Sequence, residues 1–137
     1  MATRSTISIK EINAFGNEQY KTIYCHWDGY PSHNGAILLE HYTDEEKVKK
    51  LISLGDLSAL RPNVEPTESH SFDNPQEDVV IAYHRDRGEE LCINTSYTKK
   101  YIKGEEYDYL FEDGVWKVRT KWNGRFNLLT RKKCELE

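Results

Sequence analysis

The twelve residues from Tyr24 to Gly35, YCHWDGYPSHNG, concentrate side chains that carry out chemistry. His26 and Asp28 stand two apart after an extended segment, so their side chains would share one face, and His33 follows closely. Such a set can ligate a divalent metal, or act as a general base with its orienting carboxylate. A hydrogen bond between His26 and Asp28 that fixes the loop explains the pair as well. Because the spacing matches no established metal signature, we expect neither a metal ion nor a cofactor.

An anion site is the second interpretation of this stretch. If Ser32 caps the next helix, the backbone amides of residues 33–35 point outward at the positive end of the helix dipole. Phosphate suits such a site. Trp27 and Tyr30 stand beside it in the sequence and offer aromatic faces on which a nucleobase can stack.

Arginines supply further candidate contacts to phosphate. The turn 85–88, RDRG, carries two guanidiniums able to grip phosphate bidentately, and its glycine allows the backbone conformation that presents them. Arg4, near the start of the first extended segment, is a third. A solvated hairpin tip explains the RDRG turn equally well. The candidate ligand-binding residues are therefore Arg4, His26, Trp27, Asp28, Tyr30, His33, Asn34, Gly35, Arg85 and Arg87.

Strands and two helices must position these side chains. Alternation and turn signals predict strands over residues 6–12, 19–27, 79–83, 91–95, 107–111 and 115–122, with 126–130 as a candidate edge. Asp113 and Gly114 form the strongest hairpin turn signal. Tyr42 closes a first helical stripe, and a capping box of Thr43 and Glu46 starts a second helix that Gly55 ends.

This order of elements predicts an α+β domain over residues 1–131. We expect a mainly antiparallel sheet of five to six strands, with the two central helices packed on one side. Residues 56–78 hold three of the four prolines and predict a long irregular segment that wraps the surface or covers a pocket. Residues 132–137 predict a frayed tail.

Composition narrows the class of protein. With 137 residues and a formal charge of −4, the chain lacks the basic excess of a dedicated nucleic-acid or membrane-surface protein. Three cysteines without a C-x-x-C pair favour a reduced cytoplasm over a disulfide framework, and no apolar stretch predicts export or a membrane span. A thin, aromatic-rich core suggests self-association into a homo-oligomer.

Several segments together resemble a widespread family of small, mostly uncharacterised proteins encoded by bacteriophages and prophages. These are the start ATRSTI, the YCHWDGYPSHNG box, LLEHY, ISLGDLS, the YHRDRGE turn and EEYDYLFEDGVWKV. The resemblance spans nearly the whole chain and departs at Arg61–Asp78 and beyond Trp122. It implies no established activity, although small phage accessory proteins often act against host defences.

The residues and the resemblance together predict a non-enzymatic binder in the host bacterial cytoplasm. It would sequester a phosphorylated nucleotide immune signal, cyclic ones included, without turning it over. One alternative is a metal-dependent phosphoesterase or nuclease that uses His26, Asp28 and His33. Another is an inhibitor that binds a host protein through an aromatic surface.

Overall fold

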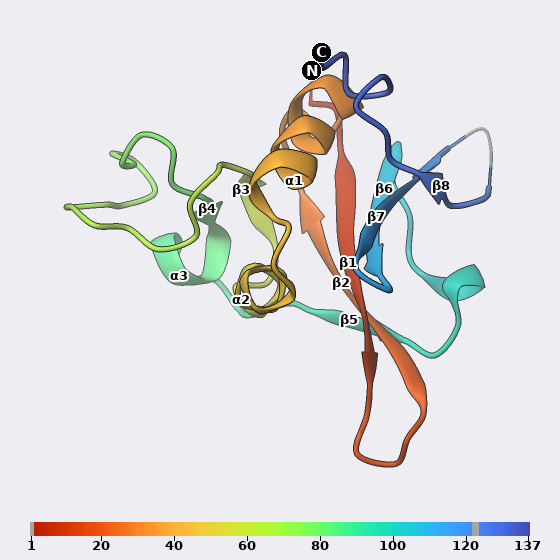
Figure 1. The fold of residues 1–137 in the computed structure, drawn as a ribbon. Coiled ribbons are helices and arrows are strands. Elements are labelled where there is room, and N and C mark those ends of the chain that lie inside the picture. Colours follow the sequence, from red (N-terminus) through yellow and green to blue (C-terminus); the bar gives the residue numbers. More distant parts are fainter. Residues whose placement is uncertain (1, 122–123) are drawn as a thin grey trace.

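The first hairpin forms where the alternation predicts it. The computed structural model describes residues 2–121 and 124–137, and in it β1 (Ser5–Ile12) pairs antiparallel with β2 (Glu18–Cys25). Gly16 in the turn has φ 80°, which glycine adopts without strain. The hairpin extends beyond the other strands and carries Phe15, 88% exposed, near its tip (Figure 1).

A second hairpin confirms the turn predicted at Asp113 and Gly114. β6 (Tyr107–Glu112) and β7 (Val115–Thr120) pair antiparallel around them. Both turn residues have positive φ, 54° and 79°, as a two-residue hairpin turn with right-handed strand twist requires. β8 (Asn127–Leu128) adds the edge beside β7. The far end of the predicted strand, at Trp122, lies outside the described residues.

The sheet is mixed and larger than predicted. Over the described ranges it has eight strands in the order β4-β3-β2-β1-β6-β7-β8, with β5 paired to β2. β1 pairs parallel with β6, and β2 pairs parallel with β3 (Leu57–Ala59). The second parallel pair follows from the helical crossover in residues 26–56, because parallel neighbours need a long connection. The α+β class is confirmed, whereas five to six strands is too low a count.

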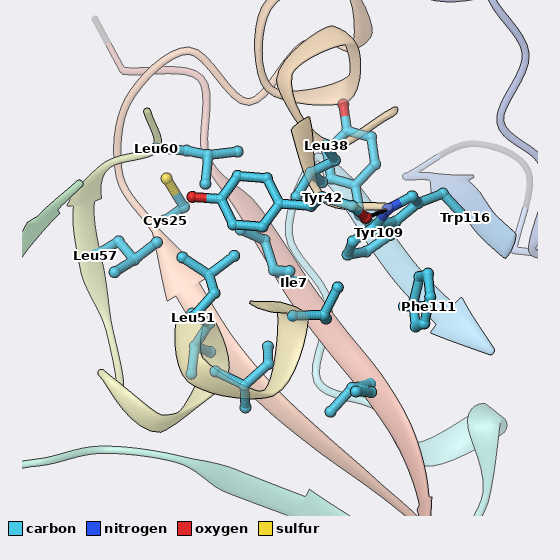
Figure 2. Close-up of a cluster of buried hydrophobic side chains, with 14 of the residues drawn as sticks. Ile7, Cys25, Leu38, Tyr42, Leu51, Leu57, Leu60, Tyr109, Phe111 and Trp116 are labelled. Carbon is cyan, nitrogen blue, oxygen red and sulfur yellow. Dashed lines mark hydrogen bonds between the residues drawn. The ribbon is translucent and has the colours of Figure 1, made fainter. Parts of the chain in front are cut away.

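Helices cover one face of this sheet. α1 (Ala36–His41) and α2 (Glu45–Ser53) pack onto a core that includes Ile7 and Tyr109 (Figure 2). The Trp116 indole donates to the Tyr42 carbonyl at 2.8 Å and joins the helices to the sheet. No described helix has the length and apolarity needed to cross a lipid bilayer.

The caps of α2 are predicted correctly at one end only. Gly55 follows the helix with φ 75°, as expected of its role. At the other end the N-cap is Asp44, whose carboxylate accepts from the Glu46 amide at 3.4 Å, so the predicted capping box at Thr43 is wrong by one residue.

No hairpin forms between residues 79–83 and 91–95. β4 (Ile81–Ala82) pairs with β3, and the chain then enters the short helix α3 (Tyr83–Arg87), which Gly88 ends at φ 73°. β5 (Asn94–Ser96) pairs with β2 instead. The RDRG sequence therefore makes a helical turn, because Gly88 serves as a helix C-cap and not as a hairpin tip.

Residues 91–106, here called the strap, include β5 and the short 3₁₀ turn η2 (Lys99–Tyr101). Ile102 of the strap packs with Tyr20, Leu110 and Phe126, a cluster separate from the main core. The C-terminal segment differs from the predicted frayed tail, because Cys134 is buried and Leu136 packs against the main core.

Candidate functional site

The YCHWDGYPSHNG box forms a corner that ties the N-terminal strand to the helices. The Asn34 side chain is fully buried, and its amide donates to the Trp27 carbonyl at 3.2 Å and the Ser5 hydroxyl at 3.3 Å. Gly29 lies against the N-terminal strand, where an added Cβ would be 2.7 Å from the Cβ of Ser5. The Tyr109 hydroxyl donates to the Gly29 carbonyl at 2.6 Å. Much of the density of the box is thus explained by folding.

The structure does not form the Ser32 cap on which the predicted anion site at the start of this helical segment depends. The π-helical turn η1 (Pro31–Gly35) has Tyr30 at its N-cap position, and no side chain caps it. The His33 amide donates to the Tyr30 carbonyl at 3.0 Å, and the Asn34 amide donates to the Asp28 carbonyl at 3.2 Å. Gly35 is buried. Two of the three amides that a phosphate would need, those of His33 and Asn34, are therefore used within this segment.

The structure does not gather His26, Asp28 and His33 into one group. Each contacts a different neighbour: His26 Nδ1 lies 2.7 Å from Tyr24 Oη, Asp28 Oδ1 accepts from Tyr30 Oη at 3.3 Å, and His33 Nδ1 lies 2.9 Å from Asn34 Oδ1. Within residues 2–121 and 124–137, no three His, Cys, Asp and Glu side chains are placed so that they could hold a metal ion. The suggested His26–Asp28 hydrogen bond is not formed, since Tyr24 and Tyr30 are the partners instead.

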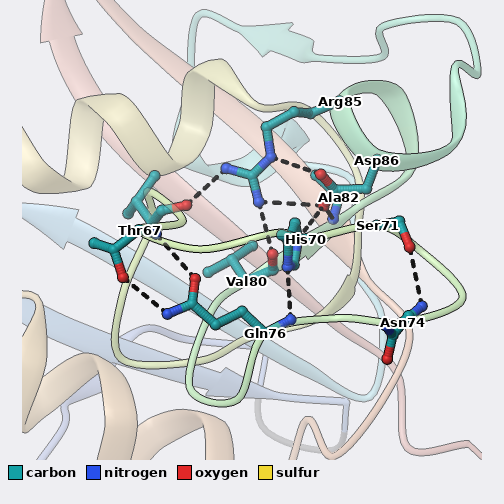
Figure 3. A network of polar contacts seen from close by, with 10 residues as sticks. Thr67, His70, Ser71, Asn74, Gln76, Val80, Ala82, Arg85 and Asp86 are labelled. Atoms are coloured by element: carbon teal, nitrogen blue, oxygen red, sulfur yellow. Dashed lines mark hydrogen bonds and ion pairs between the residues drawn. The ribbon is translucent and has the colours of Figure 1, made fainter.

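Arg85 serves the fold. Its guanidinium donates to the Val64 carbonyl at 2.6 Å, to the Val80 carbonyl at 2.7 Å and to Asp86 Oδ1 at 2.8 Å (Figure 3). These contacts use all three of its nitrogens, so the predicted grip on phosphate is replaced by a clamp on residues 64–80.

Arg87 is also engaged within the fold. It pairs with Glu89, and its guanidinium lies over the ring of Phe72 at 4.3 Å and near the ring of Tyr83 at 5.0 Å. Its charge is therefore balanced locally, and it stacks on the irregular segment that Arg85 holds in place.

Arg4 lies in a different position. It lines a cavity of about 330 Å³ between the start of the β1–β2 hairpin and the strap, here called the Arg4 pocket. Its lining includes Arg4, Tyr24, Asp56, Cys92, Lys103 and Glu105. This volume lies within the range of small-molecule sites, at its lower end.

Unpaired charges distinguish the Arg4 pocket from a larger hollow of the same molecule. The side chains of Arg4, Lys103 and Glu105 form no hydrogen bond or ion pair with any described residue. A larger hollow of about 550 Å³ is also lined by charged side chains. Its charges are paired, with Lys10 Nζ 3.5 Å from Asp113 Oδ1 and Lys49 Nζ 3.9 Å from Glu45 Oε2. Arg4, Lys103 and Glu105 therefore remain available to a ligand, unlike the charged groups of that larger hollow.

Tyr24 connects this pocket to the box. Its hydroxyl and His26 Nδ1 form a hydrogen bond in which either group can be the donor, and the His26 ring meets the Trp27 indole edge-on, with centroids 4.7 Å apart. Partial burial raises the pKa of Tyr24; Arg4 opposes this, whereas Glu105 and Tyr83 add to it. Tyr24 thus lies within the electrostatic reach of both signs of charge in the pocket. Trp27, 44% exposed, does not line the pocket and is connected to it through His26 and Tyr24.

Cys92 provides a chemical probe of the pocket. Replacing Asp56 with asparagine is expected to speed its alkylation by iodoacetamide at neutral pH. The Asp56 carboxylate, followed by partial burial, raises the pKa of the Cys92 thiol, and only the thiolate reacts. The rate should rise by a factor of a few, since each pKa unit is worth about tenfold. The Tyr24 backbone amide donates to Asp56 Oδ1 at 2.9 Å, and the side-chain oxygen of asparagine can accept the same hydrogen bond.

Intact mass measures this labelling cleanly, because Cys25 and Cys134 are buried and Cys92 is exposed. Asp73→Asn, a change at an exposed carboxylate outside the pocket lining, is the matched control. Equal rates for the Asp56→Asn variant and the parent protein would contradict the assigned contact.

Sequence reasoning identified Arg4 and the neighbours His26 and Trp27, but missed the rest of the pocket. Lys103 and Glu105 lie on the strap, and the sequence of the strap has no hydrophobic periodicity from which its path could be predicted. Tyr24 carried a usable signal, because alternation places it on the strand face opposite the buried Ile23 and Cys25.

Comparisons with protein-family models, with curated proteins and with solved structures found no match to this chain. The resemblance to phage proteins therefore stays a prediction, and the Arg4 pocket is the structural feature from which a function can be inferred.

Proposed function

We propose that this protein binds a phosphorylated nucleotide in the Arg4 pocket and sequesters it without turning it over. The observation that carries the proposal is the pair of cations, Arg4 and Lys103, which line one cavity without ion-pair partners among the described residues. A guanidinium binds phosphate bidentately and an ammonium adds a point charge. Trp27 is the candidate stacking residue, and Arg85 is not a ligand in this proposal.

The phage resemblance suggests the biological setting of this binding. Removal of a nucleotide immune signal, cyclic ones included, in the host bacterial cytoplasm would counter host defence. We include self-association in the proposal, since Ile12 and Phe15 on the hairpin are exposed apolar side chains that a second copy would cover. Native mass spectrometry measures the subunit count directly.

Loss of Arg4 should weaken nucleotide binding. Arg4→Ala and Lys103→Ala are each expected to raise the dissociation constant about 10- to 100-fold, since a hydrogen bond to a charged group is worth about 1.5–3 kcal/mol. Calorimetry measures the affinities for inorganic phosphate, for AMP and GMP, and for the 3′,5′-cyclic forms of these two nucleotides. Protection of Cys92 from iodoacetamide reports occupancy of the same pocket, because Cys92 lines it.

Arg125→Ala is the matched control, because Arg125 is exposed and outside the pocket lining. Unchanged affinity in the Arg4 and Lys103 variants, or no binding of any probe by the parent protein, would refute the proposal. Mass spectrometry of the ligand after denaturation tests sequestration: intact nucleotide agrees with it, whereas product would replace it with the phosphoesterase alternative.

A further inference from the structure

The strap is fixed to the sheet at the residues that face the Arg4 pocket. Asp108, buried on β6, accepts from the Glu105 amide at 2.8 Å and from Thr6 Oγ1 at 2.8 Å. Arg119 on β7 donates to Asp108 Oδ2 at 3.0 Å and to the Ile102 carbonyl at 3.0 Å. Both ends of the turn 102–105 are therefore held by one buried ion pair.

Gly104 lets this turn approach the ion pair. A Cβ at this position would lie 2.8 Å from Asp108 Oδ2 and 3.1 Å from Arg119 Nη2. Only a residue without a side chain fits there without displacing the carboxylate. Lys103 and Glu105 flank Gly104, so the close approach sets the position of both pocket side chains.

Glu105 gives the pocket a second chemical requirement. Its carboxylate lines the pocket and raises the pKa of Tyr24, which Arg4 lowers. No described residue donates a hydrogen bond to this carboxylate. An ionised carboxylate only accepts hydrogen bonds. A ligand whose anionic group binds Arg4 would therefore leave Glu105 desolvated and unsatisfied unless it also brings a donor.

We infer that Glu105 is a specificity-determining residue that selects ribonucleotides over deoxyribonucleotides by accepting from a ribose hydroxyl. A ribonucleotide carries a 2′-hydroxyl donor on the ribose that bears its phosphate, whereas the 2′-deoxy form lacks this donor. Carboxylates read ribose hydroxyls in this way in dinucleotide-binding folds. This inference rests on the proposed function, because it assigns the second contact of the same ligand.

Matched nucleotide pairs test the inference on the whole protein. AMP against dAMP and GMP against dGMP are compared by calorimetry, with protection of Cys92 as the second readout. The parent protein is expected to bind the ribo form about 10- to 100-fold more tightly, the scale of one charge-assisted hydrogen bond. Glu105→Ala is expected to bring that ratio to about one.

The direction in which each affinity changes distinguishes a loss of specificity from a general loss of structure. Removing the carboxylate should weaken the ribonucleotide but tighten the deoxynucleotide, whose phosphate is then no longer repelled. A variant that is merely damaged would bind both more weakly, and this result would overturn the inference. Glu106→Ala, at the exposed neighbour outside the pocket lining, should keep the ratio of the parent protein.

Failure of this inference is distinguishable from failure of the proposed function. If the parent protein binds both forms equally and Arg4→Ala still weakens both, Glu105 does not select and the nucleotide site stands. If no nucleotide binds or protects Cys92, both proposals fall together.

Discussion

Replacing Asp86 with alanine is expected to lower the free energy of unfolding by about 3–5 kcal/mol, the cost of removing one partner from a buried charged pair. The Asp86 side chain is 4% exposed. It accepts from the Ala82 amide at 2.8 Å and from Arg85 Nε at 2.8 Å, and its Oδ2 lies 3.1 Å from His70 Nε2. Alanine would leave Arg85 without its charged partner. Urea denaturation followed by tryptophan fluorescence measures the loss.

Acid should reveal the same contact in the parent protein. Burial alone would raise the pKa of Asp86, but hydrogen bonds from Arg85, the Ala82 amide and His70, together with the Arg85 charge, lower it overall. A carboxyl whose folded-state pKa is lowered stabilises the fold above its ordinary value of 3.8, and this stabilisation is lost as pH falls through the folded-state value. The Asp86→Ala variant should lack this part of the acid sensitivity.

Asp73→Ala is the control for this prediction. Asp73 is an exposed carboxylate in the same irregular segment, so its loss should change stability by no more than about 0.5 kcal/mol. If Asp86→Ala and Asp73→Ala unfold at the same urea concentration, the clamp around Asp86 does not stabilise the fold.

Local rules predicted the parts of the fold that local chemistry determines. The turn at Asp113 and Gly114 needs two residues with positive φ, and few sequences satisfy this requirement. Gly55 ends α2 for a similar reason. The parallel pairs of β1 with β6 and β2 with β3 were not predicted, because they depend on which distant segments lie side by side. A three-residue strand such as β3 carries too little pattern to be recognised alone.

The RDRG turn shows how one sequence supports two interpretations. Two arginines on either side of Asp86, followed by a glycine, resemble a phosphate grip, and a solvated hairpin tip explains the same residues. Neither describes Arg85, whose guanidinium donates to the carbonyl of Val64, 21 residues earlier, and to the carbonyl of Val80, just before β4. Only the path of residues 61–80 reveals this role, and that path has no periodic signal in the sequence.

The pocket was only partly predictable for the same reason. Tyr24 belongs to β2, whose alternation is readable, so its face follows from the sequence, and Arg4 directly precedes β1. Lys103 and Glu105 reach the pocket because a buried ion pair on β6 and β7 holds the strap there. Charges that lie far apart in the chain meet at the pocket through tertiary packing, which no spacing rule anticipates.

The box itself contributes mainly to stability in this structure, and Asn34 is its sharpest test. Asn34→Ala is expected to lower the free energy of unfolding by about 2–4 kcal/mol. It removes the donor from buried acceptors, and each buried polar group left without a partner costs about 1–3 kcal/mol. The Trp27 carbonyl and the Ser5 hydroxyl would lose their donor, and His33 Nδ1 would lose its neighbour. Because Ser5 is the first residue of β1 and directly follows Arg4, nucleotide binding should weaken as well. Urea denaturation measures the first effect and calorimetry with AMP measures the second.

Ser32→Ala separates this structural role from the helix-cap interpretation of the same box. If Ser32 capped a helix that presents free amides, its loss would cost about 1 kcal/mol. The structure gives η1 no side-chain cap and leaves Ser32 exposed, so Ser32→Ala should match the parent protein in both stability and binding. If Ser32→Ala lost stability and binding while Asn34→Ala matched the parent protein, the anion site would lie at the helix start after all. The opposite pattern assigns Asn34 to the corner that places β1, and with it Arg4, at the edge of the pocket.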